Sequence, residues 1–214
     1  NCDLVLIIKR KNMFLDLTSN ADHNVYSYLV GGISPRPIAW ISTLSEKGIA
    51  NIAPYSFFTV ASCNPPVLSV TQVNPRDHAN KDTLTNLLAT KECVVNIVSN
   101  SLVEQMNQSC ANYPNNVSEF DEANIQQSPS TLVSPPSVEA SKVRYECTLR
   151  EVITVSEKAG GGKMMLLDIV GICVDDEILV NGYIDPARLE AVGKMGGDYF
   201  STTKDKFVLK RPQL

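Results

Sequence analysis

Short β-rich runs separated by turn residues make up most of this chain. The stretches PIAWIST and GIANIAPY flank LSEKG, where Gly48 can take the positive φ of a short hairpin loop, so they predict a strand pair. The runs NPPVLSVTQV and ECVVNIVS predict two further strands. The stretches VRYECTLREVITV, GGGKMMLLDIVGICV and EILVNGYID predict a β-meander with turns at Gly160 to Gly162 and at Asn181-Gly182.

Helical spacing is confined to two short segments. After Asp82, leucines at i, i+3 and i+4 predict a helix with one buried face and with Asp82 as its N-cap. Ser101 and Glu104 form a capping-box pattern that predicts a second helix ending near Gln108. The chain then becomes polar and proline-bearing up to Pro136, and we expect this excursion to wrap the surface.

Many strands with few helices, and without regular strand-helix alternation, predict a mainly β fold. We expect a closed or nearly closed, Greek-key-like β-barrel with a few short peripheral helices. A chain of 214 residues and 23.4 kDa suits one domain, which we place at residues 13–214 after an N-terminal extension of residues 1–12.

The composition argues against nucleic acid and membranes as binding partners. The net charge of −4 gives no overall attraction to nucleic acid or to an anionic membrane, and no run approaches the roughly 20 apolar residues of a membrane span. The start of the chain lacks the apolar core of a signal peptide, which predicts a cytoplasmic protein. Six widely spaced cysteines without a CxxC pair are expected to be buried reduced thiols.

Several familiar catalytic motifs are missing from the sequence. The stretch AGGGKMM has Glu157 and Met164 where a phosphate loop needs Gly and Ser or Thr, so it predicts only a turn. Only His23 and His78 are present, far apart and without ligand spacing, so no metal site is expected. The G-x-S-x-G, H-E-x-x-H and G-x-G-x-x-G motifs are absent, which favours chemistry carried by a cofactor.

Six segments occur in an order and spacing that point to a known family. They are SPRPIAWIST, GIANIAPYSFF, NPPVLSV, NKDTLTNL, ECVVNIV and VGKMGGDYF, and the match that they define extends from about Leu15 to the C-terminus. This pattern resembles the flavin reductase-like family of FMN-binding split barrels, close to its flavoredoxin branch. The resemblance implies an NAD(P)H-dependent flavin oxidoreductase that passes hydride from NADH or NADPH to FMN.

The same resemblance implies partners and leaves alternatives open. It suggests a homodimer, with a monooxygenase or another electron-acceptor protein receiving reduced flavin or electrons. One alternative is a non-catalytic FMN electron carrier, and another is a split-barrel oxidoreductase that acts on a different substrate. The excursion from Ser109 to Ser137 looks too extended to fold on itself and well suited to lie across a neighbouring subunit.

The flavin-lining segments of the family carry over to particular residues, with no side chain needed as a nucleophile. The implied cofactor-binding residues are Arg36, Pro37, Trp40, Ser42, Asn51, Ala53, Ser56, Phe57, Lys81, Asp82, Thr83 and, over the flavin ring, Tyr199. Such a site needs cations or N–H donors for a phosphate and an apolar wall for a flat ring.

Each assignment has a purely structural alternative. Pro35 and Pro37 stiffen the backbone around Arg36 and would aim its guanidinium at a phosphate, although a solvent-facing arginine fits the same pattern. Lys81, at a helix start, suits a phosphate, whereas a neighbouring Thr or Asp there can be only a cap. A core position suits Trp40 at least as well as flavin contact, and Ser56 can be a buried hydroxyl bonded to its own backbone.

Overall fold

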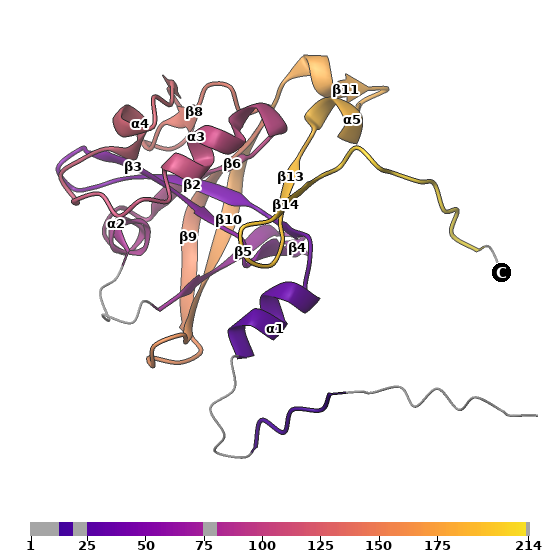
Figure 1. Ribbon diagram of the computed structural model, residues 1–214. Coiled ribbons are helices and arrows are strands. Elements are labelled where there is room, and N and C mark those ends of the chain that lie inside the picture. The colour runs from indigo at the N-terminus through magenta and orange to yellow at the C-terminus, as the bar shows by residue number, and fades with distance from the viewer. Residues whose placement is uncertain (1–12, 19–24, 75–80, 213–214) are drawn as a thin grey trace, which may run out of the picture.

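The computed structural model describes residues 13–18, 25–74 and 81–212. A seven-stranded antiparallel sheet forms the body of these residues (Figure 1). In spatial order its strands are β3 (Ala50–Tyr55), β2 (Ala39–Leu44), β6 (Glu92–Ile97), β9 (Val143–Thr154), β10 (Gly162–Val174), β5 (Pro66–Val73) and β4 (Phe58–Cys63). Because β3 also contacts β5, the sheet curls back on itself into a barrel. The predicted mainly β barrel is confirmed.

Three smaller sheets flank the barrel. One has the order β1 (Arg36–Pro37), β13 (Val192–Lys194) and β14 (Phe200–Thr202). The other two are the hairpins β7 (Gln127–Ser128) with β8 (Ser137–Val138), and β11 (Leu179–Val180) with β12 (Tyr183–Ile184). The predicted β-meander is therefore wrong, because β10 pairs with β5 and β9 whereas β11 and β12 form a sheet of their own.

Two predicted hairpin turns are confirmed. Gly48 has a φ of +76° in the loop between β2 and β3, and the six residue pairs of these strands are in register. Asn181 and Gly182 have φ values of 53° and 80°, as a two-residue turn of type I′ requires. Both residue types tolerate this left-handed region, so the local sequence is enough to define each turn.

Five α-helices and two 3₁₀ turns are found within the described ranges. They are α1 (Val25–Gly32), α2 (Asp82–Thr90), α3 (Val103–Gln108), α4 (Glu119–Glu122), α5 (Pro186–Leu189) and the 3₁₀ turns Asn100–Leu102 and Asp176–Ile178. Helix α2 and the end of α3 agree with prediction, whereas α1 and strand β4 were not anticipated.

Both predicted N-caps are wrong. Lys81 is the N-cap of α2, which places Asp82 inside the first turn, and no side chain caps this helix. The hydroxyl of Ser101 lies 3.1 Å from that of Ser99 rather than forming a capping box with Glu104. A 3₁₀ turn precedes α3 and shifts its N-cap to Leu102, so the Ser-Glu spacing no longer matches the helix start.

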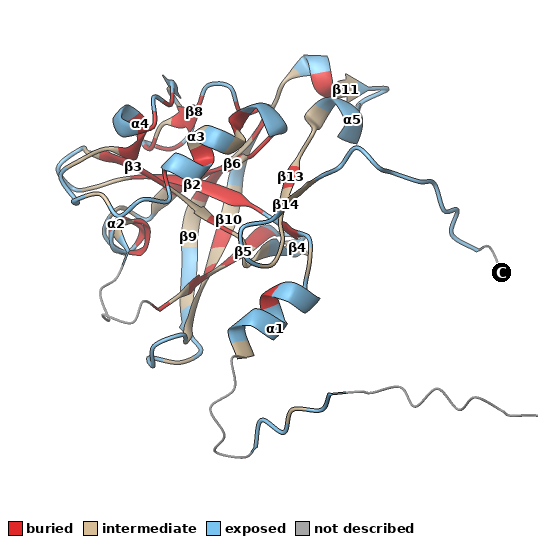
Figure 2. Ribbon diagram, in the orientation of Figure 1, coloured by how far each residue is buried: buried red, intermediate tan, exposed pale blue. Residues whose placement is uncertain are grey.

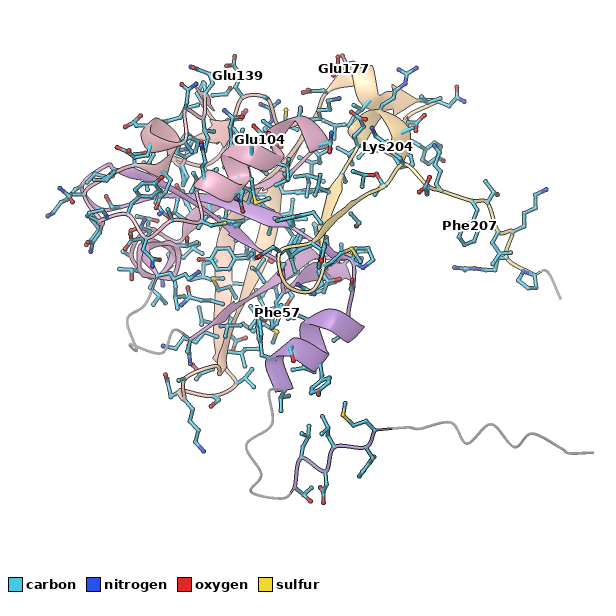
Figure 3. The ribbon with its side chains drawn as sticks, in the orientation of Figure 1. Phe57, Glu104, Glu139, Glu177, Lys204 and Phe207 are labelled. Carbon is cyan, nitrogen blue, oxygen red and sulfur yellow. The ribbon has the colours of Figure 1, made fainter. Side chains whose placement is uncertain are left out.

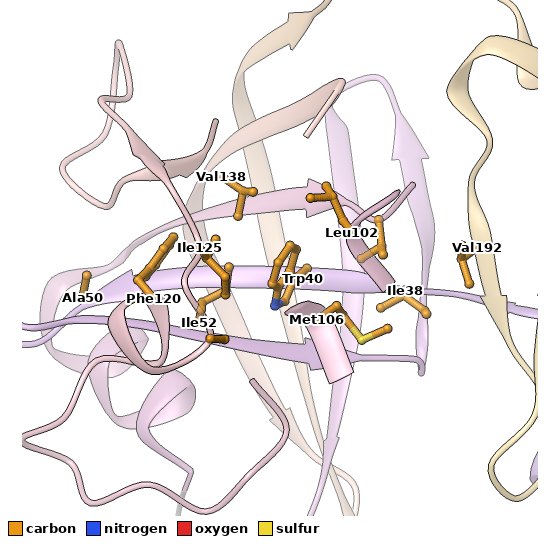
Figure 4. Close-up of a cluster of buried hydrophobic side chains, with 12 residues drawn as sticks. Ile38, Trp40, Ala50, Ile52, Leu102, Met106, Phe120, Ile125, Val138 and Val192 are labelled. Atoms are coloured by element: carbon orange, nitrogen blue, oxygen red, sulfur yellow. The ribbon is translucent and has the colours of Figure 1, made fainter. Parts of the chain in front are cut away.

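Two hydrophobic clusters pack against opposite faces of the sheet. Successive side chains of a strand point to opposite faces, and on β2 both Trp40 and Ile41 are 0% exposed. Ile41 belongs to the cluster inside the barrel, together with the α2 leucines Leu84 and Leu87. Trp40 belongs to the other cluster, which Figure 4 shows between the sheet and the segments after α3. Strand β2 is therefore buried on both faces, by the barrel interior on one side and by the excursion on the other.

The excursion from Ser109 to Ser137 folds onto its own barrel, which corrects the prediction that it cannot fold on itself. Phe120 and Ile125 are buried in the same cluster as Trp40. The hydroxyl of Ser118 donates to the Ala50 carbonyl at 2.6 Å, on the edge strand β3. The segment therefore fills the core and also covers an otherwise unpaired sheet edge.

Helix α1 and the C-terminal segment 203–212, which runs away from the barrel, are largely exposed (Figure 2). Of the five described cysteines, Cys93 and Cys147 are buried, whereas Cys63, Cys110 and Cys173 are exposed free thiols. The prediction of uniformly buried thiols is thus wrong, while Cys2, His23 and His78 lie outside the described residues. Within those residues no helix is long and apolar enough to cross a bilayer. The extension of residues 1–12 also lies outside them, and the domain boundary at residue 13 stays a prediction.

Candidate functional site

A cavity of about 580 Å³ lies where the end of β3, helix α3 and the β13–β14 hairpin meet. Its walls combine apolar and polar side chains. The lining residues are Ile38, Pro54, Tyr55, Ser56, Val103, Glu104, Met106, Asn107, Cys110, Lys194, Gly197, Asp198 and Phe200. A largely apolar hollow with a few polar groups, in this range of volume, is typical of a small-molecule site.

Two lysines supply positive charge around the cavity. The Lys81 ammonium lies 5.7 Å from the Tyr55 ring centre, and the Lys194 ammonium lies 4.2 Å from the Phe200 ring centre. Lys194 also donates to the Gly197 carbonyl at 2.5 Å. Burial raises the pKa of the Cys110 thiol, and the charges of the two lysines oppose that rise. The lining thus carries both signs of charge, from Lys194, Glu104 and Asp198, and Lys81 adds a positive charge close enough to act on Cys110.

Arg36 is not aimed at open solvent. It is 6% exposed, and its Nη1 donates to the Val30 and Ile33 carbonyls at 2.6 and 2.8 Å. Its Nη2 donates to the Met195 carbonyl at 3.2 Å, and its Nε donates to the Ser56 hydroxyl at 3.3 Å. Four of its five N–H donors are thus used within the protein, and neither sequence interpretation describes this role. Arg36 ties the C-terminal end of α1 and the 195–199 loop to the barrel.

Asn51 and Thr83 lie together in a buried polar cluster. The Asn51 amide donates to both Glu119 carboxylate oxygens at 2.9 Å, and its Oδ1 accepts from the Thr83 hydroxyl at 3.1 Å. The Thr43 hydroxyl lies 3.3 Å from the same oxygen, and the Asn86 amide donates to Thr43 at 3.0 Å. Burial raises the pKa of Glu119, and hydrogen bonds from Ile52 and Asn51 oppose the rise. These buried polar side chains are therefore hydrogen-bonded to one another.

The remaining predicted residues are divided between core and surface. The side chains of Trp40 and Ser42 are 0% exposed, with the Trp40 indole donating to Ser109 and the Ser42 hydroxyl donating to the Pro136 carbonyl. Both side chains therefore contact core neighbours in this structure, and their role as flavin-lining residues stays a prediction. Asp82 lines a separate cavity of about 430 Å³ and has its pKa raised by burial.

Five further predicted residues do not form one surface. Of these, Ser56 alone is among the lining residues. Ala53 and Phe57 are half-buried, and the Phe57 ring centre lies 5.9 Å from the Arg36 guanidinium. Tyr199 is 76% exposed and Pro37 is exposed, so neither covers the cavity in this structure.

Sequence reasoning missed the part of the site that comes from α3 and from the excursion. Met106, Asn107 and Cys110 line the cavity, and Glu119 anchors the polar cluster, although none of them stands in a recognised motif. The helical spacing after Ser101 was the available signal, because it placed a helix here without saying which face was accessible. Tyr55 also lines the cavity, and its buried hydroxyl has no hydrogen-bond partner in the described structure.

The curled sheet, short helices and cavity of small-molecule size define a split β-barrel of the cofactor-binding kind. The model of the flavin reductase like domain matches residues 31–183. The chain belongs to the flavin reductase-like family, and the resemblance seen in its motifs is confirmed. Membership supports a flavin as cofactor and flavin oxidoreduction as the class of activity.

The chain is similar to known proteins over most of its length. An uncharacterized protein of Aquifex aeolicus is 36% identical over 177 residues, which are 82% of this chain and 88% of the relative. Nitrilotriacetate monooxygenase component B from Bacillus cereus is 28% identical with a TM-score of 0.86, covering 92% of this chain and 98% of that one. Flavoredoxin of Desulfovibrio vulgaris, at 16% identity and a TM-score of 0.70 over 92% and 97% of the chains, shows the fold alone.

The residues around the cavity fit a flavin mononucleotide. Ile38, Val103 and Met106 offer an apolar wall to a flat ring, and Lys81 lies at the start of α2, where helical N–H groups favour a phosphate. Tyr55 contributes to the wall of this space, and its hydroxyl is buried beside Thr83.

Proposed function

We propose that this protein binds FMN and reduces it with hydride from NADH or NADPH, and that it passes reduced flavin or electrons to a monooxygenase or another acceptor protein. The observation that carries the proposal is a cavity of small-molecule size with an apolar wall and two lysines near it, in a chain of the flavin reductase-like family. The likeness to a monooxygenase component supports the choice of partner.

In this proposal the phosphate lies toward Lys81 and the first turn of α2, where the N–H groups of Asp82 and Thr83 have no intrahelical acceptor. The flat ring lies toward Met106 and Phe200. FMN supplies the hydride acceptor when it is bound, and this chain's residues supply binding, orientation and a wall that excludes water. No side chain acts as a nucleophile.

A visible spectrum of freshly purified protein, followed by anaerobic addition of each nicotinamide, tests the function. Flavin absorbance that bleaches quickly with NADH or NADPH is the expected result. Bound FMN that neither nicotinamide bleaches would favour the non-catalytic electron carrier. Fast nicotinamide oxidation only when another organic acceptor is added would favour a split-barrel oxidoreductase with a different substrate.

We also propose a homodimer in the cytoplasm. The excursion no longer supports a dimer, but exposed apolar side chains on α1 and on the C-terminal segment do, and large exposed apolar patches commonly mark interfaces. These side chains are Tyr26, Leu29, Ile33, Phe207, Val208 and Leu209. The described cysteines are free thiols, which is the state that a reducing cytoplasm maintains.

A further inference from the structure

The buried polar cluster connects the excursion to the first turn of α2. We call it the Glu119 cluster, and it consists of Thr43, Asn51, Thr83, Asn86 and Glu119. All five side chains are no more than 7% exposed. They come from β2, β3, α2 and α4, so one hydrogen-bonded unit joins four elements.

Glu119 determines which way this unit is oriented. A carboxylate accepts hydrogen bonds and donates none, so the Asn51 amide nitrogen must face it and Oδ1 must face the opposite side. That oxygen meets the hydroxyls of Thr43 and Thr83, both of which donate to it. The backbone N–H of Ile52 also donates to Glu119 at 3.0 Å, which holds the carboxylate against the edge strand.

The far end of the unit is the first turn of α2. Thr83 follows Lys81 by two residues, and the Lys81 carbonyl accepts from the N–H groups of Leu84 and Thr85 at 3.1 and 3.2 Å. No side chain caps α2, and the Thr83 hydroxyl bond links its first turn to the Glu119 cluster, in addition to the packing of Leu84 in the barrel core. The position of the Lys81 ammonium and of the free N–H groups of this turn therefore depends on the same hydrogen bond.

We infer that Glu119 is a positioning residue for the phosphate-binding end of the flavin site. The inference rests on the proposed function, because the phosphate is assigned to Lys81 and α2 there. Glu119 acts through Asn51 and Thr83 and touches no ligand itself. Its loss would leave donors unpaired, release the Asn51 amide and let the first turn of α2 move.

An exchange of groups between positions 51 and 119 tests this chain of contacts. Glu119→Gln replaces one acceptor oxygen by a donor that faces the Asn51 amide. Asn51→Asp places a second carboxylate against Glu119. In the double variant, the Gln amide donates to the new Asp, the Asp still accepts from both threonines, and the Gln oxygen accepts from Ile52. Only the second contact between positions 51 and 119 is not restored, because it now joins two acceptor oxygens.

The measurement is the dissociation constant of FMN and of riboflavin for each variant, by fluorescence quenching. We expect wild type to prefer FMN, each single variant to lose about tenfold or more of that preference, and the double variant to recover most of it. The control Glu122→Gln, an exposed residue of the same helix, should keep the wild-type ratio.

The outcomes separate the two claims. A wild type without FMN preference overturns the phosphate assignment and the inference together. A wild type with that preference, whose single variants melt at lower temperature but keep the ratio, overturns the inference alone and makes Glu119 merely structural. If Glu119→Gln does not fold, Thr83→Val and Thr83→Ser are compared instead, because the first removes the hydroxyl that bonds Asn51 and the second keeps it. An unchanged ratio of FMN to riboflavin affinity in Thr83→Val counts against the inference.

Discussion

Lys81 and Arg36 are the two cations of the flavin-lining motifs, and their surroundings differ. Arg36 donates to three carbonyl groups, whereas Lys81 has its ammonium near the cavity and over the Tyr55 ring. Of these two cations, Lys81 is therefore the better phosphate ligand, although both were predicted in that role. Substitution of Lys81 therefore tests the phosphate assignment.

Lys81→Ala should weaken FMN binding without slowing hydride transfer once the site is saturated. A charge-assisted hydrogen bond is worth roughly 1.5–3 kcal/mol, so we expect an FMN dissociation constant about tenfold higher or more, with riboflavin unaffected. Lys158→Ala, in an exposed loop, is the control. Stopped-flow bleaching decides the matter, and a variant that binds FMN normally but reacts slowly would place Lys81 near the ring instead.

Cys110 reports on the cavity directly. It lines the cavity with its thiol accessible, whereas Cys63 and Cys173 are exposed elsewhere and Cys93 and Cys147 are buried. We expect FMN to slow alkylation of Cys110 at least severalfold and to leave Cys63 and Cys173 unchanged. Because burial raises the pKa of Cys110, its labelling rate should climb with pH as the thiolate forms.

Peptide mass spectrometry after timed treatment with iodoacetamide gives this comparison within one sample. Cys93 should stay unlabelled, because it is buried and its contact with Cys147 raises the pKa of its thiol well above the usual value. Equal labelling of Cys110 with and without saturating FMN would place the flavin outside this cavity.

At the scale of elements, the excursion is a structural part of the barrel. Phe120 in α4 is 1% exposed and packs in the cluster with Trp40. Phe120→Ala should lower the free energy of unfolding by about 3–5 kcal/mol, the usual cost of removing a buried phenyl ring. Urea unfolding measures this loss, and Tyr183→Ala, at a 79% exposed position, should change little. A change below about 1 kcal/mol in Phe120→Ala would mean that the excursion is detachable.

The whole molecule has an extended C-terminal segment that its own barrel does not cover. Phe207 and Leu209 are 86% and 85% exposed, and Figure 3 shows Phe207 well away from Phe57 and Glu104. Burying such side chains contributes roughly 1.5–3 kcal/mol each. We expect a dimer in solution and a strong shift to monomer in the variant Phe207→Asp with Leu209→Asp.

Sedimentation at micromolar concentration with FMN bound is the measurement for the dimer. Tyr183→Asp introduces one such charge at an exposed site on the β11–β12 hairpin and should leave the dimer intact. A wild type that sediments as a monomer of 23.4 kDa would refute the dimer, and a variant that stays dimeric would move the interface away from the C-terminal segment.

The sequence by itself determined the features that depend on near neighbours in the chain. The hairpin at Gly48 follows from one residue that tolerates positive φ, and α2 follows from the spacing of its leucines. The barrel class followed from counting strands, and the family from motifs in order. None of these features requires knowledge of a distant partner, so local pattern was enough.

Only the tertiary structure decided which polar groups face each other. Arg36 bonds Met195, 159 residues away, and Asn51 bonds Glu119, 68 residues away. A hydrogen bond depends on the position of both atoms within a few tenths of an ångström, and no local pattern encodes the path between such partners. The environment of Trp40 was likewise decided by the tertiary structure. An apolar strand residue lies in the core or lines a ligand site according to which distant segment covers it, and the excursion covers Trp40.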